Sequence, residues 1–548
     1  MDRRTEASAD ARRGFGTHLT LASSLFVLVL SLPAEAQTYG GGQDQQGQNV
    51  AIQQNGNASQ QSLAATRLAA SGEIGATVVD AVEERKPAFT ITPSGSIQGT
   101  YTDNVFVVPT NTQSDWLSTI TGGLDVSGKT ERTQITANYS VSGDIYATHS
   151  ALDGYRQDLL TVDRFEPVKN IFLIDLRASV DQEQIAQTGP EAATLRSGLA
   201  NQTQVANATI TPSYVEKWGS WAVSTLSYSL NEVAYFDGGN NATANNLNDS
   251  TQQTLSAKLT SGALFNQLTW DMSLSQSVSR GTETHLDQQT AEADAEYKIN
   301  TMFRIPVTVG YDNFSENQSG FSSSSLSGVF WNTGIHFVPG PRTDLTLRYG
   351  RRYDKPYENG SLTYKVFPTV QFTATYDIAV QTQQQTLANA LQGVTVDTTG
   401  ALVTPVGGLP ATPNQTNNNL VNGVYRSRNL QFGVGGTHGL NFFNLNGQLT
   451  ARDFGGNRGG DRAENISATV GRNIGPLTAI SLVAQAQHTV DTATVLDVGK
   501  TNSLLTGVNL AYKVNEKTNM TVDLTRRHET GTFKTDEDAL VIQLSHKF

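Results

Sequence analysis

The sequence predicts an all-β chain that folds as a single closed antiparallel transmembrane β-barrel of the outer-membrane type. Three observations predict it: a half-apolar C-terminal strand, an N-terminal segment typical of a cleaved signal peptide, and recurrent two-residue alternation of apolar and polar side chains in between. Together they divide the 548-residue chain into a signal peptide at 1–36, a leader at 37–88 and the barrel at 89–548.

The C-terminal ten residues alternate between apolar and polar side chains and end on Phe548. Such a strand suits a barrel, because it closes the sheet against the first strand and leaves no unpaired edge in lipid. The same stretch resembles the C-terminal signal by which outer-membrane barrels are handed to their assembly machinery. The residues that carry this resemblance are Leu544, His546 and Phe548, whereas the glycine usual in the signal is missing.

The N-terminus predicts secretion across an inner membrane. Arginines at 3–13 precede an apolar stretch at 19–32, and Ala-Glu-Ala at 34–36 fits the small-residue cleavage rule, which predicts a mature chain beginning at Gln37. The apolar stretch is shorter than the roughly 18 residues that a membrane-spanning helix needs, so a signal peptide is favoured over an anchor.

Composition narrows the class of protein. The chain has no cysteine, which excludes a disulfide scaffold and a cysteine nucleophile. Only 37% of residues are apolar, and the formal net charge is -12. A disordered surface protein and a barrel with one face in lipid and one in water both fit a secreted chain this polar.

The alternation of side chains favours the barrel. In 303–312, Val307 and its apolar neighbours two residues apart face one way, and Thr308 and its polar neighbours face the other. A soluble sheet with this many half-apolar strands would need helices or a second sheet to cover it. Further strands with the same pattern are predicted at 135–145, 268–275, 370–377 and 520–525.

Short and long connections alternate along the chain, as expected for periplasmic turns and extracellular loops. Counting hairpins predicts about 22 strands, with 16 to 22 as the range, always an even number. Short turns are predicted at 128–131, 167–170, 216–219, 339–342, 475–476 and 515–518, and longer loops at 107–114, 185–201, 237–250, 381–422 and 455–461. Aromatic girdles are predicted from Tyr101, Tyr146, Tyr311 and Tyr353 at the extracellular end and from Phe172, Phe303, Phe337 and Phe548 at the periplasmic end.

Two segments are predicted to be long enough to fill a wide lumen: the leader at 37–88 and the loop at 381–422. The leader is rich in Gly, Gln and Asn and is predicted to be largely disordered, with a small plug or a contact to a periplasmic partner as the alternative. The loop is almost uncharged and carries apolar residues, including a possible helical turn at 387–391 ended by Gly393. We expect it to fold against the mouth or into the lumen; the alternative is a solvated external loop.

Charged side chains on the polar faces of the predicted strands are the candidate lumen residues. Both signs are represented, which favours a passive conduit whose selectivity is set by lumen polarity over a barrel that only anchors loops or partners. These candidates are Asp175, Arg177, Asp271, Glu292, Asp294, Glu296, Arg304, Arg348 and Asp377.

Several blocks resemble one family of barrels. Residues 91–94 and 100–106 resemble the opening of the beta-barrel porin 2 family, and 341–345, 349–353 and 375–385 resemble its later blocks. The family overlaps an outer-membrane group associated with exopolysaccharide and PEP-CTERM loci. The resemblance implies a porin-like or polysaccharide-exporting barrel. The expected partners are the outer-membrane bilayer, the barrel assembly machinery and polysaccharide or periplasmic export components, with no nucleic acid.

No catalytic or metal-binding constellation is predicted. The eight histidines lie at no metal-ligand spacing, and the chain is expected to be neither an enzyme nor a cofactor-binding protein. Residues 75–81 loosely resemble the coupling box of energy-dependent outer-membrane receptors. Those receptors carry a large folded plug domain between box and barrel, and the few residues before Phe89 leave no room for one.

Overall fold

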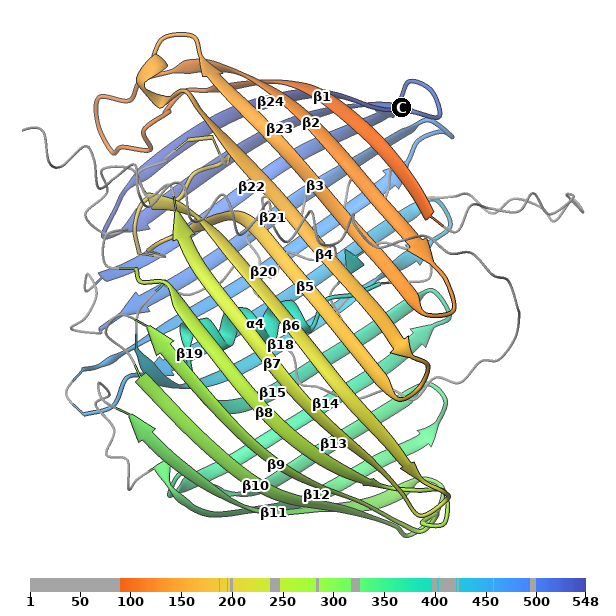
Figure 1. Cartoon of the computed structure of the whole chain (residues 1–548). Helices are drawn as coiled ribbons and strands as arrows, with labels where there is room; N and C mark the ends of the chain where they lie inside the picture. Colours follow the sequence, from red (N-terminus) through yellow and green to blue (C-terminus); the bar gives the residue numbers. More distant parts are fainter. Residues whose placement is uncertain are drawn as a thin grey trace, which may run out of the picture. The chain divides into compact units, whose positions relative to one another are not determined.

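A computed structural model of the chain describes one closed antiparallel β-barrel. The structure describes residues 89–548, with the exception of 187, 195, 198–200, 237–246, 282–284, 317–325, 397–401, 404–419, 421–422, 457 and 493–498. The barrel is a single 22-stranded sheet, which confirms the predicted fold class and strand number (Figure 1). Among the described residues, no helix is long and apolar enough to cross a membrane.

The strands follow one another round the ring in chain order. They are β1 (Phe89–Thr102), β2 (Asp115–Lys129), β3 (Thr133–Tyr146), β4 (Gly154–Val168), β5 (Phe172–Gln184), β6 (Gln202–Trp218), β7 (Ala222–Phe236), β8 (Ser250–Ser261), β9 (Leu268–Gly281), β10 (His285–Lys298), β11 (Phe303–Glu316), β12 (Gly328–Gly340), β13 (Thr343–Arg352), β14 (Lys355–Phe367), β15 (Val370–Thr382), β18 (Val424–His438), β19 (Asn441–Asp453), β20 (Gly460–Asn473), β21 (Thr478–Asp491), β22 (Gly499–Lys513), β23 (Thr518–Gly531) and β24 (Thr535–Lys547). Four short elements of the described chain are not part of the barrel sheet. They are η1 (Ser150–Leu152), α4 (Gln383–Gln392) and a small hairpin of β16 (Thr395–Val396) and β17 (Leu402–Val403).

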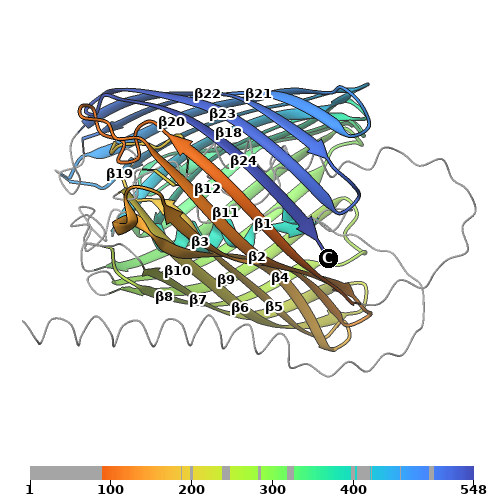
Figure 2. The same cartoon turned by 90° about the horizontal axis from the view of Figure 1, so that it is seen from above.

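The first and last strands close the ring. β1 pairs antiparallel with β24 from Thr102 opposite Ala539 to Ser94 opposite Lys547, and Figure 2 shows the two strands side by side. The amide of Phe548 donates a further hydrogen bond of 2.9 Å to the carbonyl oxygen of Pro93. No sheet edge is left at this seam, as the alternation of the terminal strand predicts.

The two faces of the wall differ as the alternation predicts. On β11, Val307 and Val309 are about half exposed, whereas Thr308 and Asp312, on the opposite face, are 2% and 1% exposed. Partners in register share a face, so the exposed apolar side chains form the outer surface and the polar ones line the inner surface. β3 departs from this pattern, because residues 135–137 are buried in succession.

The connections at one end of the barrel are short, whereas those at the other end range from two residues between β13 and β14 to the longest loops. β14 and β15 are joined by residues 368 and 369 alone, whereas β5 and β6 are joined by 185–201 and β15 and β18 by 383–423. All six predicted short turns separate strands that pair with each other.

The predicted extracellular girdle is half correct. Tyr101 and Tyr311 lie on the outer face, 41% and 50% exposed. Tyr146 does not: it is 4% exposed, and its hydroxyl donates a hydrogen bond of 2.7 Å to the carbonyl oxygen of Arg196 inside the barrel. Its register partner Leu117 is also buried, so the phase of the strand turns this tyrosine inward although it stands at a strand end.

Tyr353 also departs from the predicted girdle. It occupies the turn between β13 and β14 with a φ of 58°, and its ring packs edge-on against Phe314 at 5.7 Å. Phe314 lies on the inner face of β11, so the turn carries the ring away from lipid.

Candidate functional site

The inner surface of β8 to β13, here called the charged wall, carries a ladder of ion pairs. Arg348 Nη1 lies 2.5 Å from Asp294 Oδ2, and Arg304 Nη1 lies 3.1 Å from Glu296 Oε1. The ladder continues on β8 and β9, where Lys258 Nζ lies 3.3 Å from Asp271 Oδ2. Two of these pairs join adjacent strands, β10 with β11 and β8 with β9, where the two-residue period brings opposite charges together. Arg348 instead reaches from β13 past β12 and β11 to Asp294 on β10.

The charged wall is only partly neutralised within itself. Asp271 and Asp294 are directly opposite each other in register, and Glu292 follows on the same face of β10. Glu292 makes no hydrogen bond or ion pair with the rest of the described chain. Side chains on this wall remain accessible: Lys258 is 44% exposed and Arg304 is 35% exposed.

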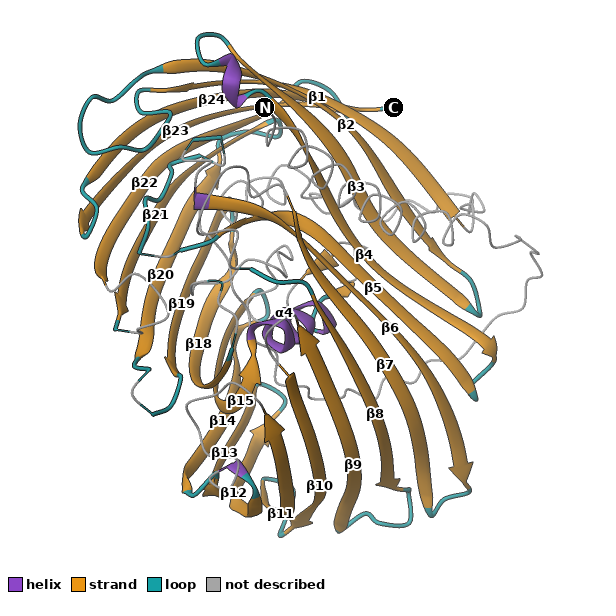
Figure 3. Ribbon diagram, turned by 60° about the vertical axis from the view of Figure 1, so that its left-hand side comes forward, coloured by secondary structure: helices purple, strands orange, loops and turns teal. Residues whose placement is uncertain are grey.

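Helix α4, which directly follows β15 in the connection to β18, lies inside the lumen, as Figures 1 and 3 show. Thr382 caps the helix: its hydroxyl accepts from the amide of Gln385, whose side chain accepts from the amide of Thr382. Gly393 ends the helix. The predicted helical turn and its glycine terminus are therefore confirmed, and the helix is longer than predicted. We refer to residues 383–423 as the α4 segment.

The first turn of α4 is held by side chains of β18, β19 and β20. Arg452 on β19 donates a hydrogen bond of 3.0 Å to the side-chain oxygen of Gln383, while Asp461 on β20 binds the same guanidinium through both carboxylate oxygens. Arg452 and Asp461 are almost completely buried. The hydroxyl of Tyr425 adds a bond of 2.6 Å to that of Thr386.

The far end of α4 is fixed to β5 and β6, on the opposite side of the ring. Asn207 donates 2.8 Å to the carbonyl oxygen of Leu387 and accepts 2.8 Å from Asn231. Arg177 donates to three carbonyl oxygens at the helix C-terminus: those of Leu391, Gln392 and Val394. A cation at this position satisfies carbonyls that lack an intrahelical partner and complements the helix dipole.

Apolar contacts accompany these polar ties. Leu387 packs with Val205, Val233 and Leu420 in a buried cluster that joins the α4 segment to β6 and β7. β6 lies half-way round the 22-strand ring from β19, so α4 spans the lumen from wall to wall. The prediction that this loop folds inward is confirmed for its described residues, α4 and Leu420 among them.

The loop between β5 and β6, residues 185–201, also folds inward. Glu191 forms a buried ion pair with Arg527 on β23, and its amide donates 3.2 Å to Glu529. Glu537 on β24 accepts from the amide of Ala193 and the hydroxyl of Ser197, each at 2.5 Å. This β5–β6 loop thus uses wall carboxylates as acceptors for its own backbone.

The two inward elements touch each other. The amide of Leu420, in the α4 segment, donates 2.9 Å to the carbonyl oxygen of Ile185, in the β5–β6 loop. Ile185 is 2% exposed. The prediction that only the leader and the 381–422 loop could fill the lumen is therefore wrong, because a third segment does so. The leader lies outside the described residues.

All nine sequence-predicted lumen residues lie on the inner face. Six of them gather on the charged wall, Asp175 and Arg177 pair at 2.6 Å on β5, and Asp377 lies on β15 opposite Asn429. Their roles in permeation stay predictions. The sequence did not single out the anchors of the inward elements, which are Glu191, Arg452, Asp461, Arg527, Glu529 and Glu537. Arg452 and Asp461 alone offered a signal, since they flank one short loop.

No family model and no curated protein matches the chain. Among solved structures, it is similar to the FrpB iron transporter from Neisseria meningitidis, with 11% identity, a TM-score of 0.47 and coverage of 83% of this chain and 82% of that one. It is also similar to the siderophore receptor PirA from Acinetobacter baumannii (10%, 0.45, 83% and 80%) and to Acinetobacter baumannii OccAB3 (9%, 0.32, 84% and 99%). Likeness this distant carries no inference about what this chain transports.

Proposed function

We propose that this chain is an outer-membrane channel that conducts small polar solutes through a lumen narrowed by the α4 segment and the β5–β6 loop. The observation that carries the proposal is the crossing of a polar lumen by two inward elements anchored to its walls. A barrel of about this strand number encloses a wide aqueous space, and such barrels either constrict or fill it. The apolar outer face supports placement in a bilayer.

The charged wall supports passage of solute rather than catalysis. Its side chains carry both signs and remain accessible, which suits a polar solute exchanging water contacts for wall contacts. The proposal assigns the lumen no catalytic role. The resemblance to the beta-barrel porin 2 family adds a finer possibility, that the solute is an exopolysaccharide on its way out of the cell.

The competing proposal is a non-conducting barrel that anchors loops or partners. It is favoured by the same inward elements, if their buried ties never open. Conductance of the purified full chain in planar bilayers separates the two. Both inward elements leave and re-enter the wall at directly paired residues: Thr382 lies opposite Val424, and Gln184 lies opposite Gln202. Each inward element can therefore be replaced by a short hairpin turn.

The channel proposal expects measurable conductance in the native chain and a several-fold increase when residues 383–423 are replaced. Replacing 532–534, a tight turn between β23 and β24, with another turn of equal length is the matched control. A native chain without conductance, together with a loop-replaced chain that conducts, would favour the scaffold. Absence of conductance in both would remove the channel proposal. Export of polysaccharide is tested separately, by its amount in the medium of cells that carry or lack the chain.

A further inference from the structure

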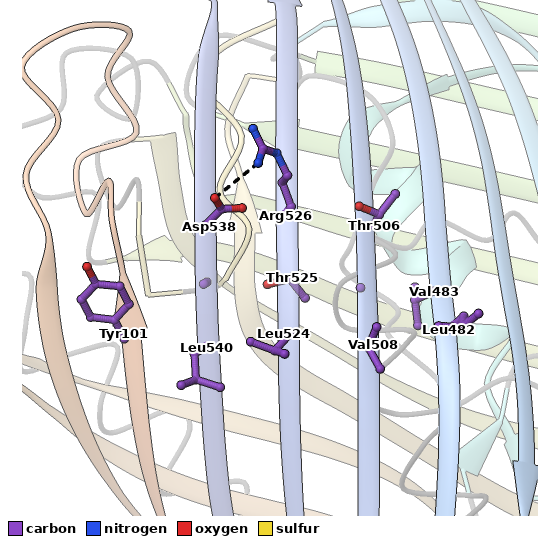
Figure 4. A pocket seen from close by; sticks show the side chains of 12 residues that line it. Tyr101, Leu482, Val483, Thr506, Val508, Leu524, Thr525, Arg526, Asp538 and Leu540 are labelled. Carbon is purple, nitrogen blue, oxygen red and sulfur yellow. Dashed lines mark ion pairs between the residues drawn. The ribbon is translucent and has the colours of Figure 1, made fainter.

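The outer face of the barrel carries a hollow beside the seam that joins β1 and β24. It has a volume of about 600 Å³ and lies over β21 to β24 and β1. One row of side chains forms its floor: Tyr101 pairs in register with Leu540, Leu540 with Leu524, Leu524 with Val508 and Val508 with Leu482. Figure 4 shows this apolar row below Thr506, Arg526 and Asp538.

The next row of side chains, towards the extracellular end, is polar and charged. Arg526 lies opposite Asp538 and Thr506, two residues beyond the apolar row on their strands. Thr506 and its next partner, Ala484, are small, which leaves the space that larger neighbours enclose. The hollow therefore has an apolar floor and a charged rim on the side of the long loops.

The rim stands where the apolar band of a membrane barrel ends. Asp538 comes ten positions before Phe548, which marks the periplasmic side of the outer face. At about 3.4 Å per residue and a strand tilt of about 40°, this separation is about 26 Å along the barrel axis. The apolar band of such barrels is about 25 Å tall. Arg526 therefore lies at the level of the outer-leaflet headgroups.

The guanidinium of Arg526 is exposed and only loosely paired. Its side chain is 63% exposed, and its contacts with Asp538 and Asp536 are long, at 3.5 and 3.8 Å. Further cations follow towards the extracellular end of the same face: Arg462 is 55% exposed and pairs with Glu464 at 2.5 Å, and Lys500 makes no ion pair within the described chain. Guanidinium groups bind phosphate oxygens through paired N–H donors.

We propose that this hollow binds a phosphorylated, acylated glycolipid of the outer leaflet, with one acyl chain on the apolar floor and a phosphate on Arg526. An acyl chain matches the floor because Leu540, Leu524, Val508 and Leu482 form one continuous apolar strip. A phosphate matches the guanidinium of Arg526 in charge and the rim in depth, and on binding it replaces the long contacts of that guanidinium with Asp538 and Asp536. The inference rests on the outer-membrane placement in the proposed function and is independent of conduction.

Native mass spectrometry of the purified full chain, titrated with lipid A and with dephosphorylated lipid A, tests the inference. We expect the phosphorylated lipid to bind at least tenfold more tightly, and Arg526→Gln to remove that preference. Thr506→Trp fills the hollow and should weaken both lipids. The matched controls are Arg472→Gln, at the opposite end of the outer face of β20, and Ala257→Trp, on the outer face of β8.

The two variants keep the test decisive. If Thr506→Trp fails to fold, judged by heat-modifiable gel mobility, the surface substitution Arg526→Gln still reports on the phosphate contact. Equal affinity of the native chain for both lipids would overturn the inference, as would equal loss in the controls. If inorganic phosphate alone displaced the phosphorylated lipid, the site would be a simple anion site, and this result would also overturn the inference. Unchanged conductance in these variants separates lipid binding from the channel proposal.

Discussion

The charged wall on β8 to β13 and the anchoring walls on β5–β7 and β18–β24 use the same residue types in opposite ways. On the charged wall, Arg348 on β13 and Asp294 on β10 neutralise each other along the inner face and stay partly exposed. On the anchoring walls, Arg177 and Glu537 bind the backbone of an inserted segment. A polar inner face therefore does not by itself say whether the lumen beside it is open. The lumen is open where the charges of the inner face pair with other side chains of the wall, and it is filled where they bind a segment inserted into the lumen.

The largest loss of stability is expected when the buried ion pair between Arg527 and Glu191 is broken. Arg527→Ala leaves a carboxylate without its partner in a site where both side chains are at most 4% exposed. Breaking such a pair costs about 3–5 kcal/mol. We expect a matching fall in the free energy of unfolding and faster proteolysis of the β5–β6 loop. A stability unchanged within error would mean that this loop is not held by the wall.

Adding an arginine sharpens the contrast between faces and between walls. Leu274→Arg places charge against lipid near the middle of β9 and should cost about 2–4 kcal/mol, because Leu274 is 62% exposed on the outer face. Ser273→Arg, on the charged wall, should be tolerated. Ser503→Arg should not, because Ser503 is 5% exposed and contacts Arg527. Folding yield and urea denaturation in micelles measure all three, and equal losses would break the assigned phase.

A smaller effect is expected at Asn207, which links α4 to β6. Asn207→Ala leaves the carbonyl oxygen of Leu387 without its side-chain donor and should cost about 1–3 kcal/mol. Conductance noise should increase, because the helix loses one tie to the far wall. Asn138→Ala is the control, since that side chain makes an exposed hydrogen bond to Asp125. Identical behaviour of the two variants would remove Asn207 from the constriction.

The smallest stability effect is expected on the charged wall itself. Arg304→Ala breaks a partly exposed pair with Glu296, and exposed pairs contribute about 0.2–1 kcal/mol. Ion selectivity should nevertheless shift towards cations, because Glu296 keeps its charge while the lumen loses a positive one. Reversal potentials in a salt gradient measure this shift. An unchanged reversal potential would place the conducting path away from the charged wall.

The sequence predicts the wall well and the contents of the lumen poorly. Val307 and Thr308 differ in polarity, so their faces follow from period two alone. The tie between Glu191 and Arg527 joins residues 336 positions apart, and no local pattern encodes it. Thr308 shows the same limit: it faces the lumen as predicted, but it is 2% exposed and bonded to Asp294 and Arg348, so an arginine is not expected to fit there.

The inward fold of α4 was within reach of the sequence because the 381–422 loop is almost uncharged and includes apolar residues such as Leu387 and Leu391. Both side chains are fully buried in the lumen. The β5–β6 loop offered no such signal. It carries charge, and its buried position depends on acceptors supplied by β23 and β24. Burial of charged loops depends on partners that only the tertiary structure reveals.

Cysteine labelling of α4 tests the central claim most directly, because the native chain has no cysteine. Single substitutions at Ala388, which is 3% exposed, and at Lys534, on the exposed turn between β23 and β24, are offered a bulky hydrophilic maleimide in intact cells. The account predicts rapid labelling of Lys534→Cys and protection of Ala388→Cys until residues 185–201 are replaced or the barrel is unfolded. Labelling of both at the same rate in the native protein would contradict a helix held across the lumen.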